Sequence, residues 1–532
     1  MSVKSSVNEF IEAIGFGLGQ IVAILSGGGA YLADGAEVLV LGAINYHLGQ
    51  DLGLSGVAMA AMVSIIFVGV MCGNLLAGVI GDHYGRKLPI LLSYSGTVSC
   101  SLVSIMLSSY WLMMVCRFLV GISFGIGVPA WNSLSGEITP IRWRLLAQSI
   151  SQSLFCFGEI YAASTLWFLD PQLKHADWRI LVAVASIPSF LFLFSALLLL
   201  TESPHFLYTQ NKLSATRDVL MRLAWWNRKD IDVQLLQAPM SPLVRQQSAG
   251  VDKTFRQELR SHLKIIFSRK YLFSTLVCCF VCYVVNTGFY GLLYALPLTV
   301  PHMEPMGTTP AGAVLGAAMF ELLGYPAVFF FDTFCTRIAN IASCSLCVGL
   351  SLTIFCVAAF LHQTTIALWS VSVAKLFVVA VFVTVYVYVV ELYPTICRTM
   401  GTALCFTAGR LGAISSPLTF ELFRLMVIGE REPSVPGEPH LAFMPFFILI
   451  ATLNFITACL TAFLPYETKG APLQAFHEPH EADERQVRRA IGFNGGQTDE
   501  SRALLGPHFG HLQAAAQQQQ QQHADAVIER AG

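Results

Sequence analysis

Long apolar runs recur along most of the chain, and short polar segments separate them. A run of about 20 apolar residues is long enough to cross a hydrocarbon layer of about 30 Å as an α-helix. The pattern therefore predicts an all-α membrane protein with twelve transmembrane helices. We expect these helices at residues 23–47, 57–80, 88–108, 110–132, 146–168, 179–200, 272–297, 311–331, 338–361, 366–390, 400–424 and 441–464.

One long polar interruption divides the predicted spans into two sets of six. Within it, the stretch ATRDVLMRLAWWNRKD spaces its apolar residues as an amphipathic helix does, so we expect it at the membrane surface. Near its end the chain turns polar and runs into AAAQQQQQQHADAV, which predicts a largely disordered tail. The predicted organisation is an N-terminal segment at 1–22, a first six-helix half at 23–200, a linker at 201–271, a second six-helix half at 272–465 and a tail at 466–532.

Basic residues indicate how the spans are oriented. Lys and Arg crowd the connections 81–87, 141–144 and 201–271, whereas the alternate connections contain few of them. Loops rich in Lys and Arg remain on the cytosolic side of a membrane. We therefore predict that the N-terminal segment, the linker and the tail are all cytosolic. The same pattern fits a multi-pass protein of the plasma membrane or of a vesicle membrane.

Composition supports the membrane class and narrows the partners. Charged residues form 12% of the chain and apolar residues 55%, with a net charge of −1. A soluble protein carries about 25% charged residues. The glycine-rich stretches GISFGIG and LSGGGAY lie within predicted spans, where glycine favours helix packing over nucleotide binding. We expect the lipid bilayer as the surroundings, and no nucleic-acid partner, metal, cofactor or enzymatic activity.

A repeated motif indicates an internal duplication. The pattern Glu-x-x-Pro-x-x-x-Arg occurs at 137–144 and again at 391–398, and 254 residues separate the two copies. Asp82 and Asp332 each follow a span and are 250 residues apart, while Arg117 and Lys375 lie inside spans 258 residues apart. Three pairs of features are thus separated by nearly the same number of residues. Two repeated bundles are typical of transporters whose halves rock about a central site.

Further motifs resemble those of the major facilitator superfamily. GVIGDHYGRK at 78–87 is similar to the signature loop between its second and third helices, and TESPHFL and LPYETKG resemble motifs of its sugar and organic-ion transporters. LADGAEVLVLGAI and NTGFYGLL resemble helices of the synaptic vesicle two-related (SVOP-like) family, over about residues 8–470. The resemblance implies two pseudo-symmetric six-helix halves and secondary transport by alternating access.

The chain departs from these families at three points. Cys335 and Thr336 stand where the second signature loop has a glycine and a basic residue, so the second half departs from the family's gate pattern. Lys375 stands where the family usually has Arg. The seventh span lacks the Gln-Gln pair of sugar porters, which argues against a hexose substrate.

The resemblance implies an ion-pair network that closes the cytosolic gate when the central site faces outward. Charge pairs at an interface hold one conformation and separate in the other. The alternative is that these charges only anchor helix ends and set the topology. The predicted gate residues are Asp82, Gly85, Arg86, Lys87, Arg117, Glu137, Arg144, Glu202, Asp332, Arg337, Lys375, Glu391, Arg398 and Glu467.

Charges inside the spans are costly in a bilayer and therefore mark candidate functional sites. Asp34 and Glu37 are three residues apart and lie on one face of the first helix. The pair is a candidate for proton coupling or for binding a cation. The alternative is a structural ion pair with a basic residue of another helix. Glu159 and Glu321, in the fifth and eighth spans, are weaker candidates for the same pathway.

Arg410 lies deep in the eleventh span and keeps its charge at any accessible pH, so it is a candidate anchor for a substrate carboxylate. Its alternative role is to neutralise Asp34, Glu37 or Glu421.

Asn286 and Tyr290 are one helical turn apart on the seventh span and can present an amide and a phenol to a ligand. Hydrogen bonding between helices is the alternative for this pair.

The sequence as a whole predicts a secondary transporter of a small organic ion that works as a monomer. Arg410 and the resemblance to the SVOP-like family together favour an organic acid as the substrate, and an organic cation is the alternative. A proton gradient or the gradient of the substrate itself would supply the energy. A different class, a binding or regulatory membrane protein that keeps this fold and moves no solute, also fits the sequence.

Overall fold

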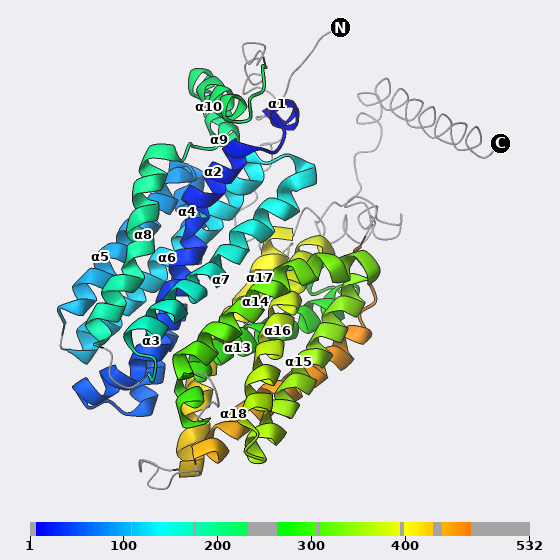
Figure 1. Ribbon diagram of the computed structural model, residues 1–532. Coiled ribbons are helices and arrows are strands. Elements are labelled where there is room, and N and C mark those ends of the chain that lie inside the picture. Colours follow the sequence, from blue (N-terminus) through cyan, green and yellow to red (C-terminus); the bar gives the residue numbers. More distant parts are fainter. Residues whose placement is uncertain are drawn as a thin grey trace. The chain divides into compact units, whose positions relative to one another are not determined.

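The computed structural model describes residues 7–107, 109–173, 177–231, 263–303, 309–393, 398–428 and 439–469 (Figure 1). Of Asp82, Asp332 and Arg398 it describes the backbone and not the side chain. Much of the linker and nearly all of the tail predicted at 466–532 lie outside these residues. The described residues of both six-helix sets belong to one compact unit, Met1–Lys253 with Ile265–Ala471.

Twelve helices of 19 or more residues make up most of the described chain, which confirms the predicted all-α fold. The first set is α3 (Gly29–Leu52), α4 (Gly56–Tyr84), α5 (Lys87–Ile105), α6 (Tyr110–Ile138), α7 (Arg144–Leu169) and α8 (Trp178–Leu199). The second set is α13 (Leu272–Thr299), α14 (Pro310–Phe334), α15 (Arg337–Phe360), α16 (Thr364–Leu392), α17 (Arg398–Ile428) and α18 (Pro439–Ala462). Each corresponds to one predicted span.

Nine helices of the described chain are long and apolar enough to cross a membrane on their own, and a tenth span counts if the bent pair Val7–Ile14 with Leu18–Val40 is one segment. The long helices outside the nine are α3, α7 and α17. These three carry the charged candidates Glu37, Glu159 and Arg410. Polar and charged residues lower the hydropathy of these three helices, whereas Arg117, Glu321 and Lys375 lie on helices that belong to the nine.

The two sets form two groups of helices that meet along a limited number of pairs (Figure 1). Within the first set α4 packs on α6 and α3 on α7, and within the second α13 packs on α17 and α15 on α16. Between the sets, α7 packs on α14, α4 on α17 and α3 on α13. A site at the junction of the halves is consequently lined by α3, α4, α7, α13, α14 and α17.

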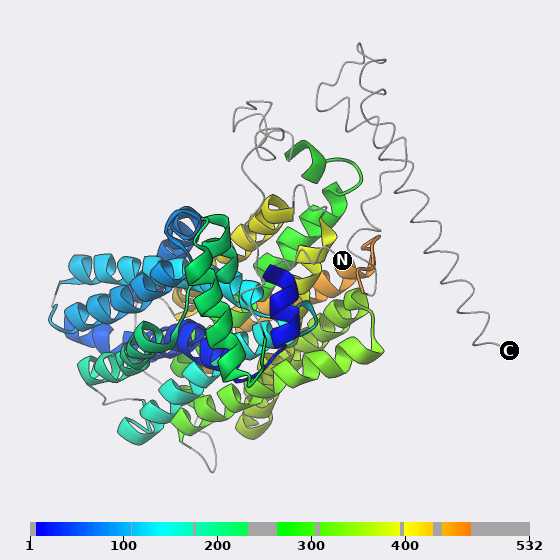
Figure 2. The same ribbon diagram turned by 90° about the horizontal axis from the view of Figure 1, so that it is seen from above.

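Short helices cover the end of the first set where α4 meets α5. They are α1 (Val7–Ile14), α2 (Leu18–Gly27), α9 (Pro204–Thr209) and α10 (Leu213–Trp226), and Figure 2 shows the blue α1 beside the green α10. The Asn227 side chain accepts from the Gly19 N–H at 2.8 Å and donates to the Gly15 carbonyl at 3.1 Å. The helix predicted in the linker is present as α10. Two short 3₁₀ helices, η1 (Ile141–Trp143) and η3 (Val300–Met303), lie in connections.

Glycines let α4 and α6 pack with their backbones in contact. A Cβ added at Gly121 or Gly125 of α6 would collide with the carbonyl oxygen of Ile66 or Val70 on α4. Gly69 of α4 faces α6 in the same way. Such small-residue contacts replace the hydrophobic effect as the force that associates helices in lipid. The expected packing role of GISFGIG is confirmed by this contact.

We predict that Gly121→Ala destabilises the protein, because the new methyl group would meet backbone atoms that cannot move aside. Overpacking of this kind costs about 1–3 kcal/mol. Thermal unfolding of the detergent-solubilised protein measures the effect. Gly316→Ala is the matched control, since a Cβ at Gly316 of α14 meets no atom within 4 Å. Equal transition temperatures for the two variants would contradict the packing argument.

Candidate functional site

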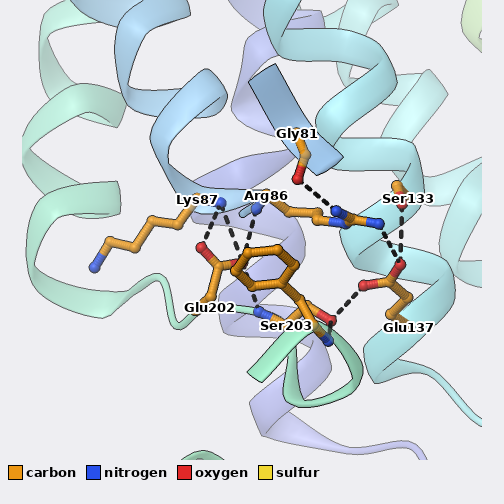
Figure 3. Close-up of polar contacts among 8 residues, drawn as sticks. Gly81, Arg86, Lys87, Ser133, Glu137, Glu202 and Ser203 are labelled. Carbon is orange, nitrogen blue, oxygen red and sulfur yellow. Dashed lines mark hydrogen bonds and ion pairs between the residues drawn. The ribbon is translucent and has the colours of Figure 1, made fainter. Parts of the chain in front are cut away.

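A polar cluster joins three connections at the end of the first half (Figure 3). Gly85 ends α4 with φ 99°, a conformation that favours glycine, and places the next two backbone N–H groups toward Glu202. Glu202 accepts the Arg86 N–H at 2.8 Å and the Lys87 N–H at 3.1 Å. The start of α5 is thereby attached to the segment between α8 and α9.

The Arg86 side chain extends this cluster to α6. Its guanidinium donates to the Gly81 carbonyl and pairs with Glu137 at 3.4 Å (Figure 3). Glu137 also accepts hydrogen bonds from Ser133, at 3.2 Å, and from Ser203. One arginine therefore ties the α4–α5 turn to the ends of α6 and α8.

The second half repeats this arrangement. Arg337 pairs with Glu391 at the end of α16, as Arg86 pairs with Glu137. Glu467 occupies the place of Glu202, and accepts the Arg337 N–H at 3.1 Å. The altered second signature loop therefore keeps this set of contacts, because Arg337 still pairs with Glu391 and its N–H still donates to Glu467.

Two substitutions in that loop are accommodated locally. Thr336, in place of a signature residue, accepts the Ala339 N–H at 3.2 Å and caps the start of α15. The Cys335 carbonyl accepts from Lys469 Nζ at 2.9 Å. A side-chain cap of this kind contributes about 1 kcal/mol to a helix terminus.

Glu467 lies outside the membrane-spanning helices and its charge is stabilised by the backbone. Burial alone would raise the pKa of this carboxyl, but the N–H groups of Lys469, Ile338 and Arg337 outweigh it and lower the pKa below its ordinary value. A carboxylate that accepts several N–H bonds is favoured in its ionised form.

For four other predicted gate residues the structure describes few or no side-chain contacts. Arg144 is exposed and donates to the Thr139 carbonyl at 3.3 Å. The side chains of Asp82, Asp332 and Arg398 lie outside the described part, so their membership of the gate stays a prediction.

Arg117 and Lys375 do not lie at this end, and their assignment to the gate is wrong. Arg117 precedes Glu137 by 20 residues on α6, which corresponds to about 30 Å along the helix. It pairs instead with Glu37 at 3.4 Å, and the two side chains are 2% and 4% exposed. Glu37 also accepts from Ser101 at 2.7 Å. The repeat offset gave the position of each residue in its half but not its partner.

Lys375 lies 16 residues before Glu391, about 24 Å along α16. Its ammonium group pairs with Glu159 at 2.8 Å and with Glu321 at 2.6 Å. The cluster combines one residue of the first half with two residues of the second. Glu159 and Glu321, the weaker candidates, thereby become part of one buried cluster.

A second central cluster surrounds Arg410 on α17. Its guanidinium donates to the Tyr290 hydroxyl at 3.2 Å and is attracted by Asp34 of α3. Tyr290 packs against Phe67 of α4 with ring centroids 4.6 Å apart. Asp34 and Arg410 are both half-buried. Predicted site residues from both halves are thus brought together here.

Asn286 contributes to this cluster through Tyr386 of α16. Its amide donates to the Tyr386 hydroxyl at 3.3 Å and to the Cys282 carbonyl at 2.8 Å. The Tyr386 ring lies between Phe382 and Phe406, stacked on them with centroid distances of 4.4 Å and 4.2 Å. The interhelical hydrogen bond considered for Asn286 is therefore present, and it positions an aromatic ladder beside Arg410.

Two of the three carboxylates considered as partners of Arg410 are paired with other residues. Glu421 pairs with Arg424 at 2.8 Å and accepts from Tyr294 at 3.0 Å, while Glu37 is paired with Arg117. Asp34 is left as the carboxylate that attracts Arg410 electrostatically.

Several side chains at this junction carry no sequence motif. The Phe382–Tyr386–Phe406 ladder lies in apolar runs and looks like core residues in the sequence. On the facing side, Asn132 accepts from Tyr31 at 3.0 Å and from Gln148 at 2.9 Å. Asn132 and Gln148 are lone polar residues within predicted spans, and this feature could have identified them from the sequence.

Comparisons with known proteins agree with this architecture. A sequence profile described as "Sugar (and other) transporter" matches residues 29–479. The chain is 26% identical to "Putative transporter svop-1" of Caenorhabditis elegans, with 89% of this chain and 87% of the relative covered. It is 24% identical to "Organic cation/carnitine transporter 7" of Arabidopsis thaliana, with 89% and 96% covered.

Solved structures show the same fold. The xylose transporter XylE from E. coli, in a partially occluded inward open conformation, superposes with a TM-score of 0.62. That match is 16% identical and covers 87% of this chain and 99% of the other. At this identity the likeness concerns the fold alone, which is the twelve-helix fold of the major facilitator superfamily.

We predict that Glu467→Gln lowers thermal stability at neutral pH and has less effect in acid. Because folding lowers the pKa of this carboxyl, its contribution to stability is present above the ordinary value of 4.5 and is lost as the pH falls through the folded pKa. Thermal unfolding across that range measures the difference between variant and parent. Exposed Asp230→Asn is the control. A difference that stays constant with pH would exclude the proposed charge stabilisation.

Proposed function

Because the chain belongs to the sugar (and other) transporter family, we propose that it carries a small organic acid across a membrane by alternating access between its two halves. The observation that carries the choice of substrate is Arg410. In the part of the chain whose side chains are described, no carboxylate forms an ion pair with it, although it lies among transmembrane helices. A permanent cation in that position favours an anionic ligand.

Hydrogen-bond donors converge beside this cation. The hydroxyl of Tyr290 accepts from Arg410, and the hydroxyl of Tyr386 accepts from Asn286, so each keeps its own O–H as a donor. A guanidinium and two phenols suit the two oxygens of a carboxylate. The Phe382–Tyr386–Phe406 ladder offers an aromatic surface on which a planar ring can stack. We therefore favour an aromatic carboxylate as the substrate.

Asp34 supplies a route for proton coupling. When ionised it attracts Arg410 and competes with the substrate carboxylate. Uptake of one proton by Asp34 removes this competition and favours anion binding, which is the sense required for symport of a proton with an acid. Glu37, one turn away, compensates the charge of Arg117, so the proton is assigned to Asp34 alone. Movement driven only by the gradient of the substrate is the alternative.

The ion pairs at the predicted cytosolic end fit a gate. Arg86–Glu137 and Arg337–Glu391 hold helix ends together within each half. Pairs of this kind stabilise one of the two conformations and must separate or rearrange in the other. Because each pair lies within one half, its proposed role is to fix the helix ends of that half at the cytosolic end, where a rearrangement of those ends would accompany opening.

Some of the same contacts also fit two other functions, transport of an organic cation and ligand binding without transport. The Asp34 carboxylate and the aromatic ladder, each of which interacts with Arg410, also suit an organic cation, because a cation can lie over aromatic faces. A binding protein with no transport activity would keep the same clusters. Saturable uptake separates a transporter from such a protein.

We predict that an aromatic carboxylate raises the thermal transition of the wild type and leaves that of Arg410→Ala unchanged. A ligand at 100 times its Kd adds about 2.7 kcal/mol of apparent stability. Arg410→Lys is the matched variant, because it keeps the charge and loses the two-pronged contact, and should respond weakly. Stabilisation by organic cations that Asp34→Asn abolishes would instead establish the opposite substrate charge.

We predict that Asp34→Asn abolishes uptake driven by a pH gradient and spares exchange of substrate across the membrane. Asparagine cannot release a proton, but the variant still binds the anion through Arg410. Uptake and exchange are measured with the purified protein in liposomes. Equal loss of both activities would remove Asp34 from the coupling step.

A further inference from the structure

Three buried side chains form a charged cluster that is not balanced. The Lys375 ammonium of α16 contacts Glu159 of α7 at 2.8 Å and Glu321 of α14 at 2.6 Å. Both glutamates are 0% exposed and the lysine is 5% exposed. One ammonium can neutralise only one of two carboxylates. With all three groups ionised, the cluster carries a net charge of −1 away from water.

The cluster lies where the two halves meet. Close to it, the Cys156 thiol of α7 donates to the Ala318 carbonyl of α14 at 3.2 Å, and the Tyr325 hydroxyl of α14 donates to the Gln152 carbonyl at 3.1 Å. These bonds join the same two helices on which Glu159 and Glu321 are found. The charges are therefore built into the contact between the halves.

Neighbouring titratable groups do not compensate the extra charge. Those that interact electrostatically with the cluster are Cys156 of α7, Tyr325 of α14 and Tyr290 of α13, and each is neutral when it holds its proton. From α3, Tyr31 acts on Tyr325, and the electrostatic partners of Asp34 are Arg410 and Glu37. Within the described side chains, the helices packed around the cluster add no second cation to it.

Unused acceptors point to a missing proton. Oε1 of Glu159 and both carboxyl oxygens of Glu321 are buried and make no hydrogen bond of good geometry to the described residues. Oε2 of Glu321 has only its ion pair with Lys375, and the two carboxyl groups lie close enough to interact with each other. Carboxylate oxygens only accept hydrogen bonds. A proton on one of them turns an acceptor into a donor, lets the carboxyl groups bond to each other and brings the net charge to zero. Leaving a buried charge uncompensated would cost far more.

We propose that Glu159, Glu321 and Lys375 form a proton-binding site shared by the two halves, whose proton holds α7 against α14. A hydronium ion of the solution gives up the proton and becomes water, one O–H bond forms on a carboxylate, and no bond of the protein breaks. Lys375 keeps its own proton and its contacts to both glutamates. The site is distinct from the Asp34–Arg410 cluster, and only its consequence for transport rests on the proposed alternating access.

That consequence follows from burial. If α7 separates from α14 as the protein changes the side to which it opens, Glu159 meets water and its charge is hydrated. The proton is then released, and its rebinding favours the conformation in which α7 and α14 are packed. Proton binding at this site thus shifts the balance between conformations even when no substrate is bound.

Infrared spectroscopy of the purified full-length protein, without substrate, tests the proposal. A protonated carboxyl has a C=O stretch that shifts in D₂O and is absent from a carboxylate. We expect the band of Glu159→Gln to be smaller than that of the wild type by one carboxyl equivalent, and the same for Glu321→Gln. In each variant the remaining glutamate is paired one to one with Lys375 and is therefore ionised. Glu421→Gln, which removes a buried carboxylate that has its own arginine, should leave the band unchanged.

Lys375→Met gives an independent readout. Without the ammonium both glutamates should be protonated, and the band should gain one carboxyl equivalent. A purely structural cluster would show the same band in the wild type and both glutamine variants, and that result would overturn the proposal. Absence of uptake in liposomes with the band intact would count against transport and leave the proton site standing.

Discussion

A charge placed among transmembrane helices must be compensated, and the interior of this protein is organised by how each charge meets that requirement. Arg117 is matched by one glutamate, Glu37, and both are almost fully buried. Two places are not matched. Lys375 faces two glutamates, and Arg410 has an attracting Asp34 but no ion pair among the described side chains. The Lys375 cluster has one excess negative charge, which favours a proton. The Arg410 cluster has one excess positive charge once Asp34 is protonated, which favours an anion.

Both unbalanced clusters include residues of the two halves, whereas the balanced pairs stay within one half. Arg86 pairs with Glu137 in the first half and Arg337 with Glu391 in the second. A balanced pair stabilises the helices that it joins without any ligand. A cluster that is balanced only when a proton or an anion binds makes the contact between the halves depend on that ligand. This difference connects the electrostatics of the bundle to alternating access.

The lengths of the apolar runs were sufficient to predict the twelve helices, because span length is a local property of the chain. Arg86 and Arg337 were selected by the resemblance of their motifs to known transporters, and their role in a gate stays a prediction. Partners across the bundle were not predictable in this way. The offset between Arg117 and Lys375 suggested a common role at the gate, but each found its partner on a different helix. The ladder around Tyr386 was hidden because aromatic residues in an apolar run look like ordinary core.

Binding of an organic anion at Arg410 together with a proton is the central step of the proposed transport. Titration calorimetry of the wild-type protein with aromatic carboxylates, repeated in buffers of different ionisation enthalpy, measures the anion bound and the protons taken up with it. We predict one bound anion and uptake of up to one proton, which disappears in Asp34→Asn. Anion binding with no proton uptake at any pH, or binding of organic cations alone, would contradict the account.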